Sequence, residues 1–257
     1  VRAIWNYMAI EHGIETVSPF ANMNYGNAKA PVKRMPIPIE DIHKVQQFCL
    51  ELDDDIRWII AAISDSSMRL AEAIGPSAGD VHLDEEVPFV RLSEHPWRRL
   101  KNAESERQVP LVRASLWGLK HALDCSDGGL LFPRYCTPEG NKANYASSAL
   151  NKWLRSYVPE GCVFHSFRHS MRDRLIAVQC PGDIIDQLGG WQTAGVGQGY
   201  GKGYKLGVPY RWLEVVVFRR RGVTNSEGPL PKAPTHSAER PQSVTTPRRS
   251  HCVTSAH

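Results

Sequence analysis

The sequence predicts an α+β protein, mainly α-helical, whose helices pack around a small three-stranded antiparallel sheet. Apolar and polar residues alternate in Val81–Leu92, and a turn at Asp84–Glu86 divides this segment into two strands. Gln108–Val112 supplies the third strand, and Pro110 favours the edge of the sheet, where its missing N–H is tolerable. The chain has 257 residues, 42% of them apolar, enough for one large domain or two small ones.

Outside these strands, apolar side chains recur at helical spacing, and everything after the sheet is expected to be helical. The expected helices are Val1–His12, Glu40–Leu52, Arg57–Ile63, the segment with Leu150, Trp153, Leu154 and Tyr157 on one face, Ser166–Val178, Asp183–Leu188, and a last helix that Pro209 opens and that runs to Arg221. Gly189-Gly190 is expected to end the helix before it, because glycine adopts the left-handed conformation common after a helix.

Changes in composition predict three parts of the chain. Asn22–Pro38 is rich in Asn, Pro, Gly and Lys and predicts a linker, with a domain boundary near Lys33–Pro36. From Thr224 to His257, Pro, Ser, Thr and Arg dominate, which predicts a disordered tail. We therefore expect a first part at 1–34, a main domain at 35–222 and a tail at 223–257. Because Val1 already lies in a predicted helix, the first part is expected to be the end of a larger domain.

Charge and cysteine content exclude little by themselves. The net charge of +4 is too small to predict a nucleic-acid partner, and no apolar run is long enough for a membrane span. The six cysteines form no C-x-x-C pair, so neither a zinc ribbon nor a redox motif is indicated. Without a visible signal peptide, a cytoplasmic protein with reduced thiols is expected.

His165 and Arg168 stand three residues apart in a predicted helix and therefore project from one face. A guanidinium offers paired N–H donors to phosphate oxygens, and an imidazole can donate or accept a proton, so the pair suits an anion. His165 and His169 also have the spacing of zinc ligands. Ser166 occupies the position where a metalloprotease would have its glutamate, which disfavours a metal site.

Tyr200 lies nine positions after Trp191, within a glycine-rich stretch, Gly197–Tyr204. Glycines on either side make the backbone permissive and the tyrosine a poor core residue. An incidental tyrosine in a surface loop fits this pattern, and so does a nucleophile that moves into a site.

Together these motifs resemble the phage integrase family, the tyrosine recombinases, over roughly Met35 to Arg221. In that family H-x-x-R precedes a His or Trp and then the nucleophilic Tyr. The upstream segments that match are Ser67-Met-Arg69-Leu-Ala-Glu72, and Arg99-Leu-Lys101 followed by Arg107-Gln-Val-Pro-Leu111. The resemblance implies the fold of the DNA breaking-rejoining catalytic core. It also implies a catalytic set of Arg69, Lys101, His165, Arg168, Trp191 and Tyr200.

The resemblance assigns roles that suit each side chain. Arg69 and Arg168 would stabilise the charge of the phosphate, and Tyr200 would form a 3′-phosphotyrosine link. Lys101 would protonate the leaving 5′ oxygen, and His165 would assist Tyr200 or hold a phosphate oxygen. Trp191, which stands where His is commoner, would donate its indole N–H. Glu72 would orient its arginine or histidine neighbours.

The chain departs from the family pattern in several places. Ser66-Ser67 stands where the family has Thr-Gly, and Tyr204 competes with Tyr200 as nucleophile. Arg98, Arg99 and Lys120 are alternatives to Lys101 as the general acid, because they lie nearby and the hairpin can be displaced by a residue or two relative to the family pattern.

The function that the resemblance implies is site-specific recombination or integration for a phage or mobile element, with no metal, no ATP and no other cofactor. The expected partners are double-stranded DNA and three further copies of the chain, joined into a homo-tetramer through the C-terminal helix, and no membrane. Two alternatives stay open: a nicking-closing enzyme of the type IB topoisomerase kind, and an inactive relic that binds DNA. Val1–Asn22 resembles the end of the preceding core-binding domain.

Overall fold

The computed structural model describes residues 2–15, 17–21, 35–100, 105–191 and 203–218. Contacts divide the chain into two compact units, residues 1–34 and 35–257. The first unit holds α1 (Arg2–Glu11), none of whose residues is buried. Arg2 donates a hydrogen bond to the carbonyl of Phe20 at 2.9 Å, and the Phe20 ring packs edge-on to Trp5. These contacts fold the short segment after α1 back onto the helix.

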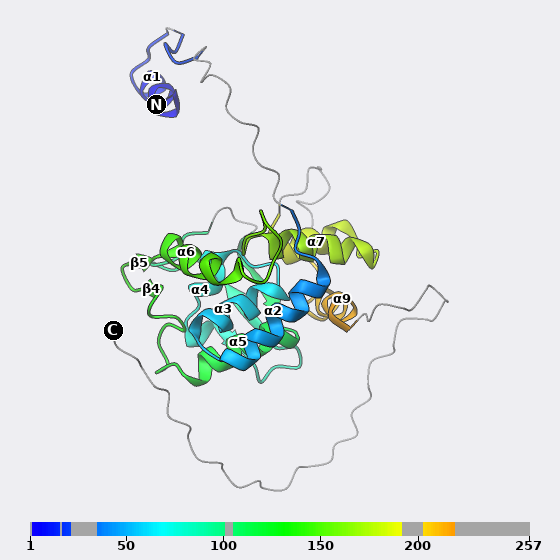
Figure 1. Cartoon of the computed structure of the whole chain (residues 1–257). Helices are drawn as coiled ribbons and strands as arrows, with labels where there is room; N and C mark the ends of the chain where they lie inside the picture. The colour runs from blue at the N-terminus through cyan, green and yellow to red at the C-terminus, as the bar shows by residue number, and fades with distance from the viewer. Residues whose placement is uncertain (1, 16, 22–34, 101–104, 192–202, 219–257) are drawn as a thin grey trace, which may run out of the picture. The chain divides into compact units, whose positions relative to one another are not determined.

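The second unit contains the sheet and the remaining helices (Figure 1). Its elements are α2 (Ile39–Leu52), α3 (Asp55–Ser64), α4 (Leu70–Ile74), a 3₁₀ turn η1 (Ala78–Asp80), β1 (Val81–His82), β2 (Phe89–Leu92), β3 (Arg107–Pro110), α5 (Arg113–Asp124), β4 (Cys136–Thr137), β5 (Gly140–Asn141), α6 (Ala143–Leu154), α7 (Ser166–Ala177), α8 (Gly182–Gly189) and α9 (Gly207–Phe218).

Helix α3 forms the centre of this unit. Every residue from Trp58 to Ser64 is buried, and α2, α5, α6 and α7 all contact the helix. The side chain of Asp54 accepts a hydrogen bond from the backbone N–H of Arg57 and so caps its first turn. Gly118 lets α5 approach closely, because a Cβ atom there would lie 2.4 Å from the carbonyl oxygen of Trp58.

The three-stranded antiparallel sheet is confirmed, with strand order β1-β2-β3. Val90 in the central strand pairs with Val81 on one side and Val109 on the other. Strand β3 lies at the edge, as Pro110 predicted. The expectation that everything after the sheet is helical was wrong at one place: β4 and β5 form a second hairpin. Its turn contains Pro138 and Gly140, the latter at φ 153°, and such residues favour a tight reversal over a helix.

A second apolar cluster joins α7, α8 and α9. Met171 and Leu175 of α7 pack with Ile184 of α8 and with Leu213 and Val216 of α9. The last helix therefore buries one face within its own chain.

The boundaries of α9 differ from the expected ones. The helix begins at Gly207 rather than at Pro209, and Phe218 is the last residue of it that the structure describes. Pro209 falls in the first turn, where a missing N–H costs no helical hydrogen bond. The predicted tail, Thr224–His257, lies outside the described residues.

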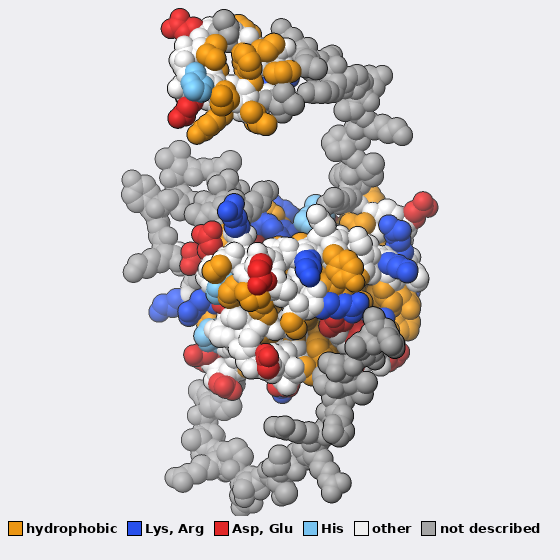
Figure 2. Space-filling model, turned by 90° about the vertical axis from the view of Figure 1, so that its left-hand side faces the viewer, with side chains coloured by type: hydrophobic (Ala, Val, Ile, Leu, Met, Phe, Trp, Pro, Cys, Tyr) orange, Lys and Arg blue, Asp and Glu red, His pale blue; other side chains and the backbone are white. Residues whose placement is uncertain are grey.

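The surface that Figure 2 displays carries basic and acidic side chains side by side rather than a field of one sign. This agrees with the small net charge of +4. No helix in the described ranges combines the length and the apolar character that crossing a membrane requires.

Candidate active site

Arg69 stands at the N-terminus of α4, where it is tied to Glu72 twice. Its backbone N–H donates to the Glu72 carboxylate at 2.7 Å, and its guanidinium donates to the other carboxylate oxygen at 2.5 Å. The guanidinium also donates to the hydroxyl of Ser105 at 3.1 Å and to the carbonyl of Gly190 at 3.0 Å. The side chain is thus fixed across three segments of the chain.

Arg168 reaches the same place from α7. Its side chain is buried, at 4% exposure, and donates to the carbonyls of Ser67 and Gly189, the second at 2.5 Å. Its guanidinium carbon lies 4.2 Å from the centre of the Trp191 ring, a cation–π distance. Arg69 and Arg168 therefore donate to the carbonyls of two adjacent residues, Gly190 and Gly189.

The end of α8 explains why these two residues are glycines. Gly190 caps the helix in the left-handed conformation, at φ 56°, as the Gly-Gly signal predicted. A Cβ atom on Gly189 would lie 1.9 Å from the Trp191 ring, so only glycine allows the indole to fold back over the helix end. The backbone N–H of Trp191 donates to the carbonyl of Asp186 at 3.0 Å and fixes that reversal.

Glu72 and Arg107 form the base of the site. Glu72 is 4% exposed and accepts two hydrogen bonds from the Arg107 guanidinium, at 3.1 and 3.3 Å. Arg107 also donates to the carbonyls of Leu188, at 3.0 Å, and Ser105, at 2.9 Å. Burial would raise the pKa of Glu72, but the charges and hydrogen bonds of Arg107 and Arg69 outweigh burial and lower it. Glu72 is thus an ionised anchor for two arginines, which agrees with its expected orienting role.

Arg107 was missed as a site residue by the sequence reasoning. The available signal was its position at the start of the Arg107-Gln-Val-Pro-Leu111 stretch, on the edge strand β3. Strand periodicity alone gives no reason for an arginine to be buried there.

The cluster carries more positive than negative charge. Three guanidinium groups, on Arg69, Arg107 and Arg168, face the single carboxylate of Glu72. Burial, together with the like charge of Arg69, lowers the pKa of Arg168 to about 9. A bound anion would relieve this repulsion, and the planar guanidinium with its five donors suits the oxygens of a phosphate.

His165 lies at the N-cap of α7, one turn before Arg168, and is half-buried. Its described ring contacts are with Phe164, at a centroid distance of 6.4 Å, and His169, at 5.3 Å. The structure therefore brings Arg69, Arg168 and Trp191 together through Gly189 and Gly190, and gives His165 contacts within its own segment. As the N-cap residue, His165 directly precedes the helix that carries Arg168.

Lys101 and Tyr200 lie outside the described residues. Ser105, four positions after Lys101, contacts both Arg69 and Arg107. Arg98, one alternative to Lys101, is fully buried and donates to the carbonyl of Ser93, so that its side chain serves the local turn.

Tyr204, the competing nucleophile, is held at α8. Its hydroxyl donates a hydrogen bond to Asp183 at 2.5 Å. Its backbone N–H donates to the side-chain oxygen of Gln187 at 2.8 Å, and its carbonyl accepts from the side-chain nitrogen of Gln187 at 2.9 Å. The hydrogen bond to Asp183 raises the pKa of the Tyr204 phenol, with a contribution from burial. These contacts hold the Tyr204 phenol against α8, and Tyr200 stays the nucleophile that the family resemblance predicts.

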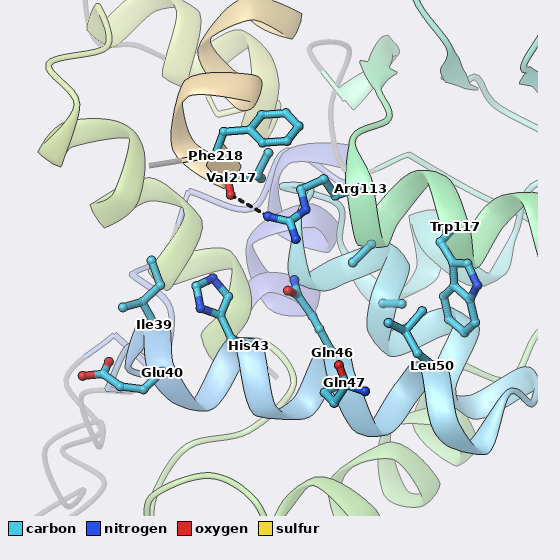
Figure 3. A pocket seen from close by; sticks show the side chains of 12 residues that line it. Ile39, Glu40, His43, Gln46, Gln47, Leu50, Arg113, Trp117, Val217 and Phe218 are labelled. Carbon is cyan, nitrogen blue, oxygen red and sulfur yellow. Dashed lines mark hydrogen bonds between the residues drawn. The ribbon is translucent and has the colours of Figure 1, made fainter. Parts of the chain in front are cut away.

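Two other features of the described residues bear on where the site lies. Within the described ranges, no three or more His, Cys, Asp or Glu side chains gather as metal ligands would. A cavity of about 850 Å³ opens between α2, α5 and α9, with His43, Arg113 and Phe218 in its lining (Figure 3). Arg113 donates to the carbonyl of Val217 there at 3.0 Å. None of the cavity's lining residues belongs to the arginine cluster, so the concentrated charge, rather than the cavity, marks the candidate site.

Comparison with protein-family models matches residues 39–204 to the phage integrase family. Because the match spans more than half of the chain, the chain belongs to this family. It is a tyrosine-type site-specific recombinase, which confirms the expected class of enzyme.

Solved structures agree with this fold. The integrase of the Tn1549 transposon in complex with circular intermediate DNA is 14% identical, with a TM-score of 0.53, over 80% of this chain and 73% of that one. The same integrase with transposon right end DNA is 13% identical, with a TM-score of 0.53, over 76% of this chain and 73% of that one. At such identities the likeness establishes the fold. A comparison with curated protein sequences gives no significant match.

Proposed function

We propose that this chain cleaves and rejoins strands of double-stranded DNA through a covalent 3′-phosphotyrosine at Tyr200. One observation carries the proposal: Arg69 and Arg168, ninety-nine positions apart, donate to the adjacent carbonyls of Gly190 and Gly189. Trp191 follows these glycines directly, and the stretch that holds Tyr200 comes next in sequence. The two cations therefore lie at the base of the segment that carries the nucleophile.

The arginine pair suits the transition state of phosphodiester cleavage. Negative charge grows on the non-bridging oxygens as the nucleophile attacks, and preorganised donors aimed at those oxygens lower the barrier. Arg168 and Arg69 are preorganised by carbonyl and carboxylate partners, with Glu72 and Arg107 behind them. Each guanidinium has five N–H donors, so these partners leave donors for a phosphate.

The bond changes balance without a further reactant. The Tyr200 oxygen bonds to phosphorus while the bond from phosphorus to the 5′ oxygen breaks. Tyr200 loses its proton to His165 or to water, and Lys101 gives a proton to the leaving 5′ oxygen. Trp191 donates its indole N–H to a phosphate oxygen. The reverse attack by a 5′ hydroxyl restores the phosphodiester and frees Tyr200, so no ATP is consumed.

The partners follow from the same chemistry. The solved relatives described above are integrases in complex with DNA, and a DNA phosphate is the anion that the arginine cluster suits. Residues 35–222 would be the catalytic domain and 1–34 the end of a core-binding domain. Assembly into a homo-tetramer on DNA would use the C-terminal helix. Because Leu213 and Val216 pack within the chain, the surface left for a neighbour includes Phe218, which is 61% exposed.

The test uses nicked duplexes with a randomised sequence around the nick, so that cleavage releases a short fragment and traps the covalent product. We expect a protein–DNA adduct that survives denaturation, with a blocked 3′ end and a free 5′ hydroxyl. Tyr200→Phe should abolish the adduct, and Tyr204→Phe should keep it. Loss of the adduct in Tyr204→Phe alone would reassign the nucleophile.

Further outcomes separate the alternatives. In one outcome, the protein relaxes supercoiled plasmid through the adduct without exchanging strands between two duplexes. That result would favour a nicking-closing enzyme. DNA binding without an adduct on any duplex would favour an inactive relic and overturn the proposal.

A further inference from the structure

We infer that Arg172 binds the DNA phosphate next to the one that is cleaved, on the same strand. This inference rests on the proposed function and adds a residue that the family pattern did not supply. Arg172 lies one turn after Arg168 on α7, on the same face of the helix. It therefore extends the cationic cluster along the direction of the helix.

Trp191 sets an upper limit on the distance between the two cations. The guanidinium carbons of Arg168 and Arg172 lie 4.2 and 5.0 Å from the centre of its ring. They cannot be farther apart than the sum of these distances, 9.2 Å. Successive phosphates of one DNA strand advance about 3.4 Å along the helix axis. Two cations at this separation can thus meet neighbouring phosphates of one strand.

The two arginines differ in their access to solvent. Arg168 is buried and held by backbone carbonyls, whereas the Arg172 side chain is 45% exposed. Arg172 donates to the Asp186 carboxylate through one nitrogen, at 3.3 Å. A single contact of this kind orients the guanidinium and leaves most of its five N–H donors for an external anion.

Asp186 links this arginine to the site itself. Its carboxylate accepts from Arg172, while its backbone carbonyl accepts from the backbone N–H of Trp191 at 3.0 Å. Asp186 thus holds both the outer cation and the backbone of Trp191, whose ring contacts both arginines. The charge of Arg172 also lowers the pKa of Arg168, since the two like charges lie close together. A phosphate beside each would compensate both.

Arg134 provides a matched control. Like Arg172, it is a partly exposed arginine in a single ion pair: its side chain is 54% exposed, and its nitrogen lies 3.5 Å from the Asp55 carboxylate. It stacks on Tyr135, at 5.4 Å from the ring centre. Arg134 differs from Arg172 in lying away from the arginine cluster. It therefore tests whether replacing any partly exposed arginine weakens DNA binding.

The first measurement is the salt dependence of binding to a fluorescent duplex of about 20 bp, from roughly 50 to 200 mM salt. Loss of one phosphate contact should lower the slope of log K against log salt by about one. We expect Arg172→Gln to lower the slope and to raise the Kd roughly ten-fold. Arg172→Lys should keep the slope, because it keeps the charge. Arg134→Gln should match the unaltered protein, and an Arg172→Gln variant that also matches it overturns the inference.

The second measurement locates the phosphate. Duplexes that carry one neutral methylphosphonate linkage, placed in turn along the strand, are bound to the unaltered protein and to Arg172→Gln. Neutralising the phosphate beside the cleaved one should weaken binding of the unaltered protein and have no further effect on the variant. Equal weakening in both proteins contradicts the assignment. If the slope falls as expected while no duplex yields a covalent adduct, the proposed function fails and Arg172 stands as a phosphate contact.

Discussion

Two clusters in the larger unit each bury an arginine, and they differ in charge balance. The first surrounds Arg168, where three guanidinium groups face the carboxylate of Glu72. The second surrounds Arg98, which is fully buried 3.8 Å from the Asp80 carboxylate. That carboxylate also pairs with His95 at 3.0 Å, and the His95 ring stacks on Trp97 at 4.6 Å.

The cation of the second cluster has a carboxylate of its own in Asp80, whereas three cations of the first share the carboxylate of Glu72. Burial lowers the pKa of Arg98, but Asp80 and Glu72 act in the opposite direction. For Arg168, burial and the like charges of Arg69, Arg107 and Arg172 lower the pKa, and Glu72 opposes them. A buried charge needs a partner, so the balanced cluster stabilises a turn. An external anion would lower the free energy of the unbalanced cluster. The balance of charge around a buried arginine thus separates a structural role from a binding role.

The largest expected effect is on stability. Arg98→Met leaves Asp80 buried with only His95 as an ionisable partner and should lower the free energy of unfolding by about 3–5 kcal/mol. Urea denaturation measures the change. The double variant Asp80→Asn/Arg98→Met should recover part of the loss, because no unpaired charge remains. A loss below about 1 kcal/mol in Arg98→Met would end the structural interpretation of this cluster.

Arg168→Lys should instead act on the reaction. Lysine keeps the charge but not the forked geometry, so the single-turnover rate of cleavage should fall about 100- to 1000-fold, or roughly 3–4 kcal/mol of barrier. A rate within about ten-fold of it would show that the guanidinium does not contact the reacting phosphate.

A smaller effect is expected from Gly189→Ala. The added Cβ would meet the Trp191 ring and force it away from Arg168, at a cost of about 1–3 kcal/mol in stability. Cleavage should fall as well. Gly182→Ala is the matched control at the other end of α8, where a Cβ atom meets nothing within 4 Å. Equal stability of the two variants, measured by thermal unfolding, would contradict the close packing of Trp191.

The smallest expected effect is a change in the free energy of unfolding at acidic pH. Since Arg107 and Arg69 lower the pKa of Glu72 in the folded state, its ionised form adds stability above the ordinary pKa of 4.5. That stability is lost as the pH falls through the folded-state pKa. We therefore expect the difference in unfolding free energy between the unaltered protein and Glu72→Gln to shrink below pH 4.5. A difference that stays constant with pH would mean that Glu72 is not paired as described.

The sequence by itself determined the class of fold, the edge strand with Pro110, the end of α8 at Gly189-Gly190 and the family to which the chain belongs. These depend on local preferences: alternation in strands, helical periodicity, and the conformations open to glycine and proline. It missed the hairpin of β4 and β5, because two-residue strands leave no periodicity to detect.

Only the tertiary structure decided which arginines share a site. Arg107 and Arg172 look in sequence like surface residues, and Arg98 looks like an alternative to Lys101. Their roles depend on partners up to 81 positions away, as with Arg107 and the carbonyl of Leu188. Whether a guanidinium meets a carboxylate, a carbonyl or solvent is set by long-range packing, and the free energy of a buried charge depends on that packing.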